Sequence, residues 1–481
     1  MEHVDVLIVG AGISGIGAAY HLQKRCPKKS FAILEGREAI GGTWDLFKYP
    51  GLRSDSDMHT FGYAFRPWPD KDSIASASAI LTYLADTARE YGIDEKIRFR
   101  HKVVAADWSS ADAQWTVTVA RGETGDTVKM TCGFLFMCTG YYNYEEGYFP
   151  DFPGMDRFQG RIIHPQKWTA DTDYAGERVV IIGSGATAVT IAPVMAQNAA
   201  HVTMLQRSPS YVVARPMEDV VEKAIRRWLP KSWTYTIIRW KNILFTLYFF
   251  KQSRKNPEGA KKFVLDQVRD ALGPDYDIET HFTPSYNVWD QRVCMVPDGD
   301  LFKAIRAGSV TMVTDHIDTF DETGIRLRSG EHLDADLVVP ATGLQLQLLA
   351  GVPLTLDGAA VNPSESFQYK GVMFSDIPNL AWTIGYTNSS WTLKADLTAE
   401  YVARLLKTMD RKKAKICVPK LDDPEVTAED FFDFTSGYVQ RGKDVLPKTG
   451  SKFPWRLKQD YVRDIFILRF GRVEDGTLEF R

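Results

Sequence analysis

Residues 4–15 read VDVLIVGAGISG, and this stretch decides the fold of the chain. Its first six residues are mostly β-branched and apolar, which is typical of a strand buried in a parallel sheet. Three glycines in the spacing GxGxxG follow, and a helical pattern then continues to about Leu22. A second strand over 30–34 ends at Glu35, which completes the order of a dinucleotide-binding βαβ unit.

The three glycines and the acidic residue each have a physical task. Gly10 permits a tight turn, Gly12 lets the backbone approach a pyrophosphate, and Gly15 lets helix and strand pack closely. The helix N-terminus offers free N–H groups and partial positive charge to phosphates. Glu35 can accept hydrogen bonds from a ribose 2′-hydroxyl and would repel a 2′-phosphate. This unit therefore suits FAD or NAD and not NADP.

A second unit of the same kind has the opposite charge at its end. Residues 178–182 read RVVII, and 183–188 continue with GSGATA, in which alanine takes the third glycine position as the motif allows. The next strand, 201–205, is soon followed by Arg207. A planar guanidinium there can bind a 2′-phosphate, so this unit suits NADPH. The alternative is that Arg207 is a solvated surface arginine.

Two nucleotide sites of opposite charge preference predict a chain that moves a hydride from NADPH to FAD. A strand followed by Thr-Gly stands at both borders of the second unit, with the strands at 134–137 and 333–339. This pair resembles the crossover connections of flavoproteins that bind two dinucleotides. We predict an α/β fold with two Rossmann-like dinucleotide-binding domains, the NADPH domain inserted in the FAD domain, plus a helical insertion. The expected boundaries are 1–150 for the first part of the FAD domain, 151–335 for the NADPH domain with the helical insertion at about 218–280, and 336–481 for the second part of the FAD domain with a C-terminal tail that caps the substrate.

The bulk composition limits the function classes. The 481 residues carry a net charge of −3, which gives no case for nucleic-acid binding. The five cysteines show no paired spacing, so we expect neither a disulfide framework nor a metal site. Reduced thiols fit a cytoplasmic protein. No run of about 18 apolar residues is present, so no transmembrane helix is expected.

Residues 223–255 combine basic and aromatic side chains in a helical pattern. Such a stretch can lie on a membrane surface, which would make the protein membrane-associated. The alternative, which we favour, is a helical insertion that packs on the NADPH domain or lines the access route of a substrate.

Two features bear on the chemistry at a flavin. No cysteine lies between Cys26 and Cys132, which argues against a thiol relay and leaves oxygen, or a substrate at the flavin itself, as the electron acceptor. A helical pattern over 391–406 follows a polar run, and its N-terminus can point at the flavin ring, where partial positive charge would stabilise reduced flavin. Plain packing is the alternative for that helix.

Residues 158–168 read FQGRIIHPQKW and match the pattern FxGxxxHxxxW. On this motif the chain resembles the type I Baeyer–Villiger monooxygenases, within the class B flavoprotein monooxygenases, and most closely the ethionamide-activating subgroup. Trp168 favours that side over the N- and S-oxygenating flavin monooxygenases, whereas Thr169 stands where the signature has Pro or Asp. We assign His164 a role in the connection between domains and not in proton transfer.

The resemblance also implies the site residues. Arg292 falls where the family has its active-site arginine, and Asp55 falls where the family has its carboxylate partner; these two are the expected catalytic residues. Gln291 stands where the family often has a lysine that contacts the NADPH phosphate, so more of that contact must rest on Arg207 and Ser208. The expected cofactor-binding residues are Gly10, Gly12, Ser14, Gly15, Glu35, Gly42, Thr43, Trp44, Arg53, Asp55, Val103, Gly183, Ser184, Gly185, Ala186, Thr187, Arg207, Ser208 and Thr392.

The resemblance implies a reaction in which NADPH reduces FAD and O₂ gives a C4a-peroxyflavin, which inserts one oxygen atom into a ketone to form an ester or lactone. Sulfoxidation is expected as a second reaction. Three alternatives stay open: an N- or S-oxygenating flavin monooxygenase, an NADPH oxidase that releases H₂O₂, and a peripheral membrane protein whose nucleotide sites are regulatory. The abundant aromatic residues favour an apolar ketone.

Overall fold

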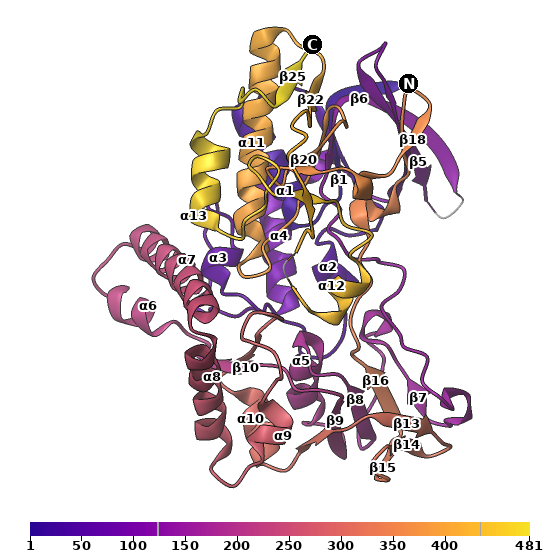
Figure 1. The fold of residues 1–481 in the computed structure, drawn as a ribbon, viewed down its shortest axis with the longest axis vertical. Helices are drawn as coiled ribbons and strands as arrows, with labels where there is room; N and C mark the ends of the chain where they lie inside the picture. Colours follow the sequence, from indigo (N-terminus) through magenta and orange to yellow (C-terminus); the bar gives the residue numbers. More distant parts are fainter. Residues whose placement is uncertain (123–124, 433) are drawn as a thin grey trace.

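The computed structural model describes residues 1–122, 125–432 and 434–481. It has two lobes, each built on one sheet, and the chain passes from the first lobe to the second and back (Figure 1). The first lobe holds a nine-stranded sheet and the second a five-stranded sheet. The chain is therefore an α/β protein with two Rossmann-like domains, as the two glycine motifs predicted.

The first sheet is centred on the strand that the sequence pointed to. β1 (Glu2–Val9) lies parallel to both β2 (Phe31–Leu34) and β6 (Asp126–Met137). Val6 and Ile8 face one core cluster while Leu7 and Val9 face another, so both faces of the strand are buried. This explains the continuous apolar run. The remaining strands of the sheet are β3 (Ile97–Arg98), β4 (His101–Ser109), β5 (Gln114–Arg121), β17 (Leu354–Leu356), β18 (Ala359–Val361) and β21 (Leu380–Trp382).

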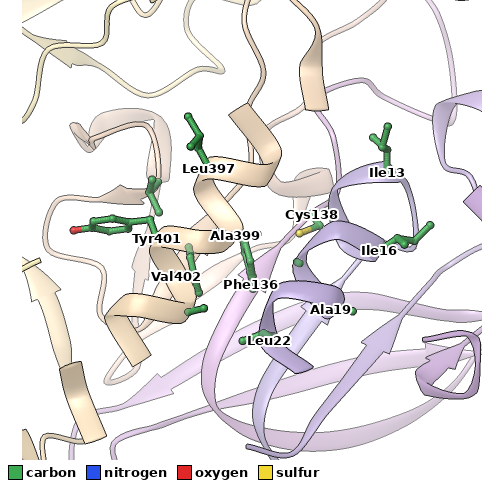
Figure 2. Close-up of a cluster of buried hydrophobic side chains, with 14 of the residues drawn as sticks. Ile13, Ile16, Ala19, Leu22, Phe136, Cys138, Leu397, Ala399, Tyr401 and Val402 are labelled. Atoms are coloured by element: carbon green, nitrogen blue, oxygen red, sulfur yellow. The ribbon is translucent and has the colours of Figure 1, made fainter. Parts of the chain in front are cut away.

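One face of this sheet is covered by two helices that are far apart in the sequence. α1 (Ile13–Arg25) and α11 (Trp391–Lys412) lie side by side, and their side chains share a core with β6 (Figure 2). α4 (Ala77–Glu90) packs on α1. The residues that Figure 2 labels in this core are Ile13, Ile16, Ala19, Leu22, Phe136, Cys138, Leu397, Ala399, Tyr401 and Val402. The return of the chain after the second lobe thus completes the first core.

The second sheet is fully parallel, in the order β12-β9-β8-β16-β7. Its strands are β7 (Arg161–Ile162), β8 (Arg178–Ile182), β9 (His201–Gln206), β12 (Val310–Thr314) and β16 (Leu337–Pro340). α5 (Ala186–Met195), which follows the second glycine motif, packs against this sheet and against α10 (Asp300–Arg306). Trp168 is buried in the same core, so the last residue of the FxGxxxHxxxW pattern anchors the second lobe.

The prediction of a single strand over 333–339 was wrong, because the structure divides this stretch between two strands in different sheets. β15 (His332–Asp334) ends the small antiparallel sheet with β13 (Ile317–Phe320) and β14 (Gly324–Leu327), whereas β16 belongs to the second main sheet. The break falls at Asp336, whose carboxylate accepts hydrogen bonds from the backbone and side chain of Arg178. Because β16 begins at Leu337, the expected boundary at 335–336 lies before the last strand of this sheet.

The helical insertion consists of α6 (Val220–Ile225), α7 (Lys231–Lys255), α8 (Pro257–Leu272) and α9 (Ile278–Phe282). It leaves the second lobe through β10 (Val212–Arg215) and returns to it through the parallel strand β11 (Cys294–Pro297). α8 packs on the second lobe, but α7 also reaches the first lobe, where the Tyr235 hydroxyl donates to the His59 carbonyl (3.0 Å) in α3 (Met58–Phe61). The insertion therefore contacts both lobes and not the second lobe alone.

The residues after α11, 413–432 and 434–481, pack on the first lobe and are called the C-terminal segment below. It contains α12 (Gly437–Arg441), α13 (Tyr461–Asp464) and a final strand, β25 (Leu478–Phe480), which pairs with β22 (Cys417–Pro419). All five cysteines are buried and free. Within the described ranges no helix is long and apolar enough to cross a membrane, and no cluster of three or more metal-ligating side chains is found.

Candidate active site

One cavity of about 1120 Å³ brings the two glycine motifs together. Its wall includes the ends of β1 and β2 in the first lobe and of β8 and β9 in the second. In parallel α/β sheets, ligands bind beyond the carboxyl ends of the strands, because helix N-termini and loops meet there. The cavity therefore occupies the place where two dinucleotides would meet end to end.

The first glycine motif has the geometry that its sequence predicted. Gly10 adopts φ +103°, a conformation that favours glycine, and Gly12 lines the cavity. Gly15 does not line the cavity: a Cβ there would lie 1.9 Å from the Gly10 carbonyl oxygen. The N-cap of α1 is Gly12, and no side chain caps it. Unpaired backbone N–H groups at this end suit a pyrophosphate.

Glu35 directly follows β2 and is buried, yet it borders the cavity. One carboxylate oxygen accepts from the Ala11 backbone N–H (2.8 Å) and the other from the Arg37 backbone N–H (2.9 Å). These two bonds fix the carboxylate beside the glycine turn. Each oxygen keeps a further lone pair for a ribose hydroxyl.

Other expected residues of the first site gather around the same part of the cavity. The Thr43 hydroxyl lies 3.1 Å from the Tyr144 hydroxyl. Arg53, which lines the cavity, is paired with Asp300 of α10 (2.5 Å), so this ion pair joins the two lobes. The expected residues of the first unit and of the loops after it that line the cavity are Gly10, Gly12, Ser14, Glu35, Gly42, Thr43, Trp44, Arg53, Asp55 and Val103.

The second glycine motif repeats this arrangement with a different charge. Gly183 adopts φ +136°, and a Cβ there would lie 2.5 Å from the Ala341 carbonyl oxygen. Gly185 is the N-cap of α5, again without a side-chain cap. The Ser184 hydroxyl donates to the Ser208 carbonyl (3.0 Å), which fixes the loop after β9. Arg207 and Ser208 are exposed and line the cavity. The expected residues of this motif that line it are Gly183, Ser184, Gly185, Ala186 and Thr187.

Arg292 and Asp55, which are 237 positions apart in the sequence, form an ion pair of 2.5 Å. Their side chains are 34% and 40% exposed, and both line the cavity. The Asp55 carboxylate raises the pKa of Arg292 above its usual range, so the guanidinium stays charged. Arg292 follows a tight turn in which Trp289 adopts φ +72° and Asp290 accepts from the Asn287 backbone N–H (3.0 Å).

Three tyrosines surround this pair, and sequence reasoning did not single them out. The hydroxyls of Tyr141 and Tyr142 lie 2.8 Å apart, and Tyr438 reaches the same region from α12. Burial raises the pKa of each of the three hydroxyls above its usual range, so they remain protonated and can donate hydrogen bonds. A signal for the first two existed in the sequence, since they directly follow Thr139-Gly140 at the crossover. Tyr438 lies in the stretch 436–441, which only the family resemblance indicated, as part of the tail that caps the substrate.

Thr392 is placed differently from the other expected cofactor residues. It is fully buried in the first turn of α11 and does not line the cavity, because its side chain packs into the core. Its neighbour Trp391 lines the cavity instead, stacks on Tyr141 (ring centroids 5.1 Å apart) and donates from its indole nitrogen to the Ser14 hydroxyl (2.8 Å).

His164 lies outside the cavity wall. Its Nδ1 accepts from the Gln166 backbone N–H (3.1 Å), and burial lowers the pKa of its imidazole. The ring is so close to Gly147 that a Cβ there would clash with it at 2.0 Å. Gly147 lies in the connection from β6 of the first lobe to β7 of the second lobe. His164 therefore contacts the chain segment that connects the two lobes.

Comparisons with known proteins show the family to which the chain belongs. Residues 4–241 match the family model described as flavin-binding monooxygenase-like. The chain is 53% identical over 480 residues to the FAD-containing monooxygenase EthA of Mycobacterium tuberculosis, covering 100% of this chain and 98% of the relative. It is 48% identical to the probable FAD-binding monooxygenase AlmA of Acinetobacter baylyi, covering 100% and 96%.

Solved structures show the same fold at low sequence identity. A steroid monooxygenase bound to NADP superposes with a TM-score of 0.76 at 21% identity, covering 99% of each chain. Cyclohexanone monooxygenase from Rhodococcus sp. Phi1 bound to NADP⁺ gives 0.76 at 19% identity, covering 100% of this chain and 99% of the other.

Proposed function

Because this chain belongs to the flavin-binding monooxygenase family and is thus a flavin-dependent oxidoreductase, we propose that it converts ketones to esters or lactones. In this reaction a ketone, O₂, NADPH and a proton give the ester, NADP⁺ and water. The observation that carries the proposal is the Arg292–Asp55 ion pair, which faces a cavity shared with both glycine motifs.

The residues of the first lobe fit FAD. The uncapped N-terminus of α1 can bind the pyrophosphate, and Glu35 can accept from a ribose hydroxyl. The second lobe fits NADPH by the same argument, with Arg207 in place of the carboxylate. When bound, NADPH supplies the hydride and FAD the oxygen activation.

Arg292 is the proposed catalytic residue because its charge faces the space where a ketone would react. Negative charge develops on the transferred oxygen and on the carbonyl oxygen of the substrate. A fixed cation in a site shielded from water stabilises such charge strongly. Asp55 is a positioning residue that orients the guanidinium and offsets its charge when no anion is present. The protonated Tyr142 and Tyr438 hydroxyls can donate to the carbonyl oxygen.

The second candidate is oxygenation at sulfur or nitrogen, which the same cavity allows. Both candidates need a bound flavin and NADPH, so cofactor use does not separate them. An oxidase that releases H₂O₂ is the third candidate, and it would consume NADPH without oxygenating any substrate.

Product analysis separates these candidates. The FAD-loaded protein is incubated with NADPH, air and a panel of ketones plus one aryl sulfide, and products are identified by gas chromatography and mass spectrometry. We expect an ester or lactone from at least one apolar ketone, with one NADPH oxidised per product. Sulfoxide without any ester would favour the second candidate, and peroxide alone would favour the oxidase.

We also propose that one face of the insertion contacts an anionic membrane surface. Along α7 a row of apolar side chains points to solvent at helical spacing, including Trp233 (66% exposed) and Tyr248 (62%). The opposite face of α7 is buried and includes Arg239, so this helix carries much of its apolar surface on the outside. Trp228 (84% exposed) follows the exposed cations Arg226 and Arg227. Aromatic groups beside cations are what an interfacial helix presents to anionic lipid. The members of the row are Trp233, Ile237, Trp240, Leu244 and Tyr248.

Sedimentation with vesicles tests this contact. We expect the protein to bind vesicles that contain anionic lipid and not purely zwitterionic ones. The double variant Trp228→Ala/Trp233→Ala should bind more than about tenfold more weakly, since each tryptophan loses burial in the interface. Phe99→Ala, which removes an exposed phenyl group from the first lobe, is the matched control. Equal binding of wild type and the double variant would contradict the proposal.

A further inference from the structure

Two arginines with no carboxylate partner line the cavity in the region of the second glycine motif. Arg207 follows β9, and Arg441 is the last residue of α12, which belongs to the C-terminal segment. Among the residues that the structure describes, neither guanidinium forms an ion pair or a hydrogen bond with a protein group. Partial burial lowers the pKa of Arg441, and the like charge of Arg207 lowers this pKa further.

Arg441 is held in place by an aromatic ring and by the chain crossover. Its guanidinium lies 3.4 Å from the centroid of the Tyr148 ring. A Cβ on Gly343, the glycine of the returning crossover, would lie only 3.3 Å from Nη2 of Arg441. The Tyr148 backbone N–H donates to the Gly343 carbonyl (3.1 Å), so both contacts belong to one fixed unit. A planar cation stacked on an aromatic ring keeps its N–H edge free for an anion.

Within the described part of the chain, the carboxylate of Asp315 next to Arg207 forms no ion pair with it. Asp315 follows β12, next to β9, and lines the same cavity. Its oxygens accept from the backbone N–H groups of His316 (2.6 Å) and Ser329 (3.1 Å). Gln291, where a lysine would be expected from the resemblance, adds no positive charge. Two arginines whose N–H groups are not bound to a carboxylate can bind a phosphate dianion together.

We propose that Arg441 is a second ligand of the NADPH 2′-phosphate and binds it together with Arg207. This inference rests on the proposed binding of NADPH to the second lobe. Arg441 belongs to a segment that packs on the first lobe, so the phosphate would join the second lobe to the C-terminal segment. That segment also carries Tyr438, which lies beside Arg292 and Asp55. Binding of the 2′-phosphate would then hold Tyr438 in position beside Arg292 as well as holding the coenzyme.

The experiment compares NADP⁺ with NAD⁺, because the two differ only in the 2′-phosphate. Dissociation constants for both are measured by flavin absorbance on the FAD-loaded protein. The variants are Arg441→Ala and Arg207→Ala, and Lys448→Ala is the control that removes an exposed cation of the same segment away from the cavity. FAD content and melting temperature verify that each variant is folded.

We expect Arg441→Ala to weaken NADP⁺ binding roughly ten- to a hundredfold, since one charge-assisted contact is lost. NAD⁺ binding should change less than about threefold, because NAD⁺ never makes that contact. Arg441→Lys should recover part of the difference as a point charge. The inference is overturned if Arg441→Ala weakens NADP⁺ and NAD⁺ equally or leaves NADP⁺ binding unchanged.

The variant Arg207→Ala separates a failure of the inference about Arg441 from a failure of the proposed binding of NADPH to the second lobe. If Arg207→Ala loses the preference for NADP⁺ and Arg441→Ala keeps it, the NADPH assignment stands and the role of Arg441 is wrong. If neither variant changes the preference, the 2′-phosphate does not bind at this end of the cavity, and the NADPH assignment to the second lobe falls together with the inference.

Discussion

Arg292→Ala is expected to lower ester formation by about a hundredfold or more, while NADPH still reduces the flavin at close to the normal rate. The reason is that Arg292 faces the cavity with a permanent charge, and the hydride step needs no such cation. Anaerobic stopped-flow absorbance measures flavin reduction, and product analysis under air measures oxygenation. The separation between the two rates is the diagnostic result.

Two further variants define what this loss means. Arg292→Lys keeps a charge but not the planar fork that fits the Asp55 carboxylate, so it should recover only part of the activity. Asp55→Asn removes the charge that orients Arg292, and we expect a smaller loss than for Arg292→Ala. Normal ketone oxygenation by Arg292→Ala would mean that the Arg292–Asp55 pair is structural only.

Gly15→Ala is expected to destroy the FAD site. Its Cβ would lie 1.9 Å from the Gly10 carbonyl oxygen and 3.0 Å from the carbonyl carbon, and backbone atoms cannot move aside as a side chain can. α1 would have to separate from β1, at a cost of about 3 kcal/mol or more. We expect protein that purifies without FAD or aggregates, measured by the flavin-to-protein absorbance ratio and by the melting temperature.

Gly185→Ala is the matched control in the second motif. Gly185 has φ −81°, and a Cβ there would meet nothing within 4 Å. This variant should keep its FAD and its melting temperature. A Gly15→Ala protein with a full complement of FAD and an unchanged melting temperature would show that the close contact of α1 and β1 is not required.

The elements of the two βαβ units were predictable because their signals are local. β8 has the bounds expected for it, and β1 and β9 differ by one or two residues at an end. Apolar runs indicate strands buried on both faces, and glycine spacing fixes the turns. The helices expected to end near Leu22 and Leu406 continue to Arg25 and Lys412, since helix ends give weaker signals than helix interiors.

Local sequence patterns gave incomplete or wrong predictions where the neighbours of a residue come from distant parts of the chain. The apolar pattern predicted one strand over 333–339, because a local pattern does not show that Asp336 accepts a hydrogen bond from Arg178 of another strand. Thr392 was expected at the cofactor, but the packing of α11 against α1 turns it into the core and brings Trp391 to the cavity. The helical insertion was expected to pack on the NADPH domain or to line the access route of a substrate, and its helix α7 also packs on the first lobe.

By itself the sequence predicted two dinucleotide sites of opposite charge preference, since glycine spacing and the residue after the second strand are properties of short segments. The pairing of Asp55 with Arg292 could be expected only from the family resemblance, and the tertiary structure brings the two side chains to 2.5 Å. The family resemblance implied only that the C-terminal tail caps the substrate, and the tertiary structure decided that Tyr141, Tyr438 and Arg441 line the same cavity. These residues come from a crossover and from the C-terminal segment, and no local pattern records which distant segments meet when two lobes and a tail close around one space.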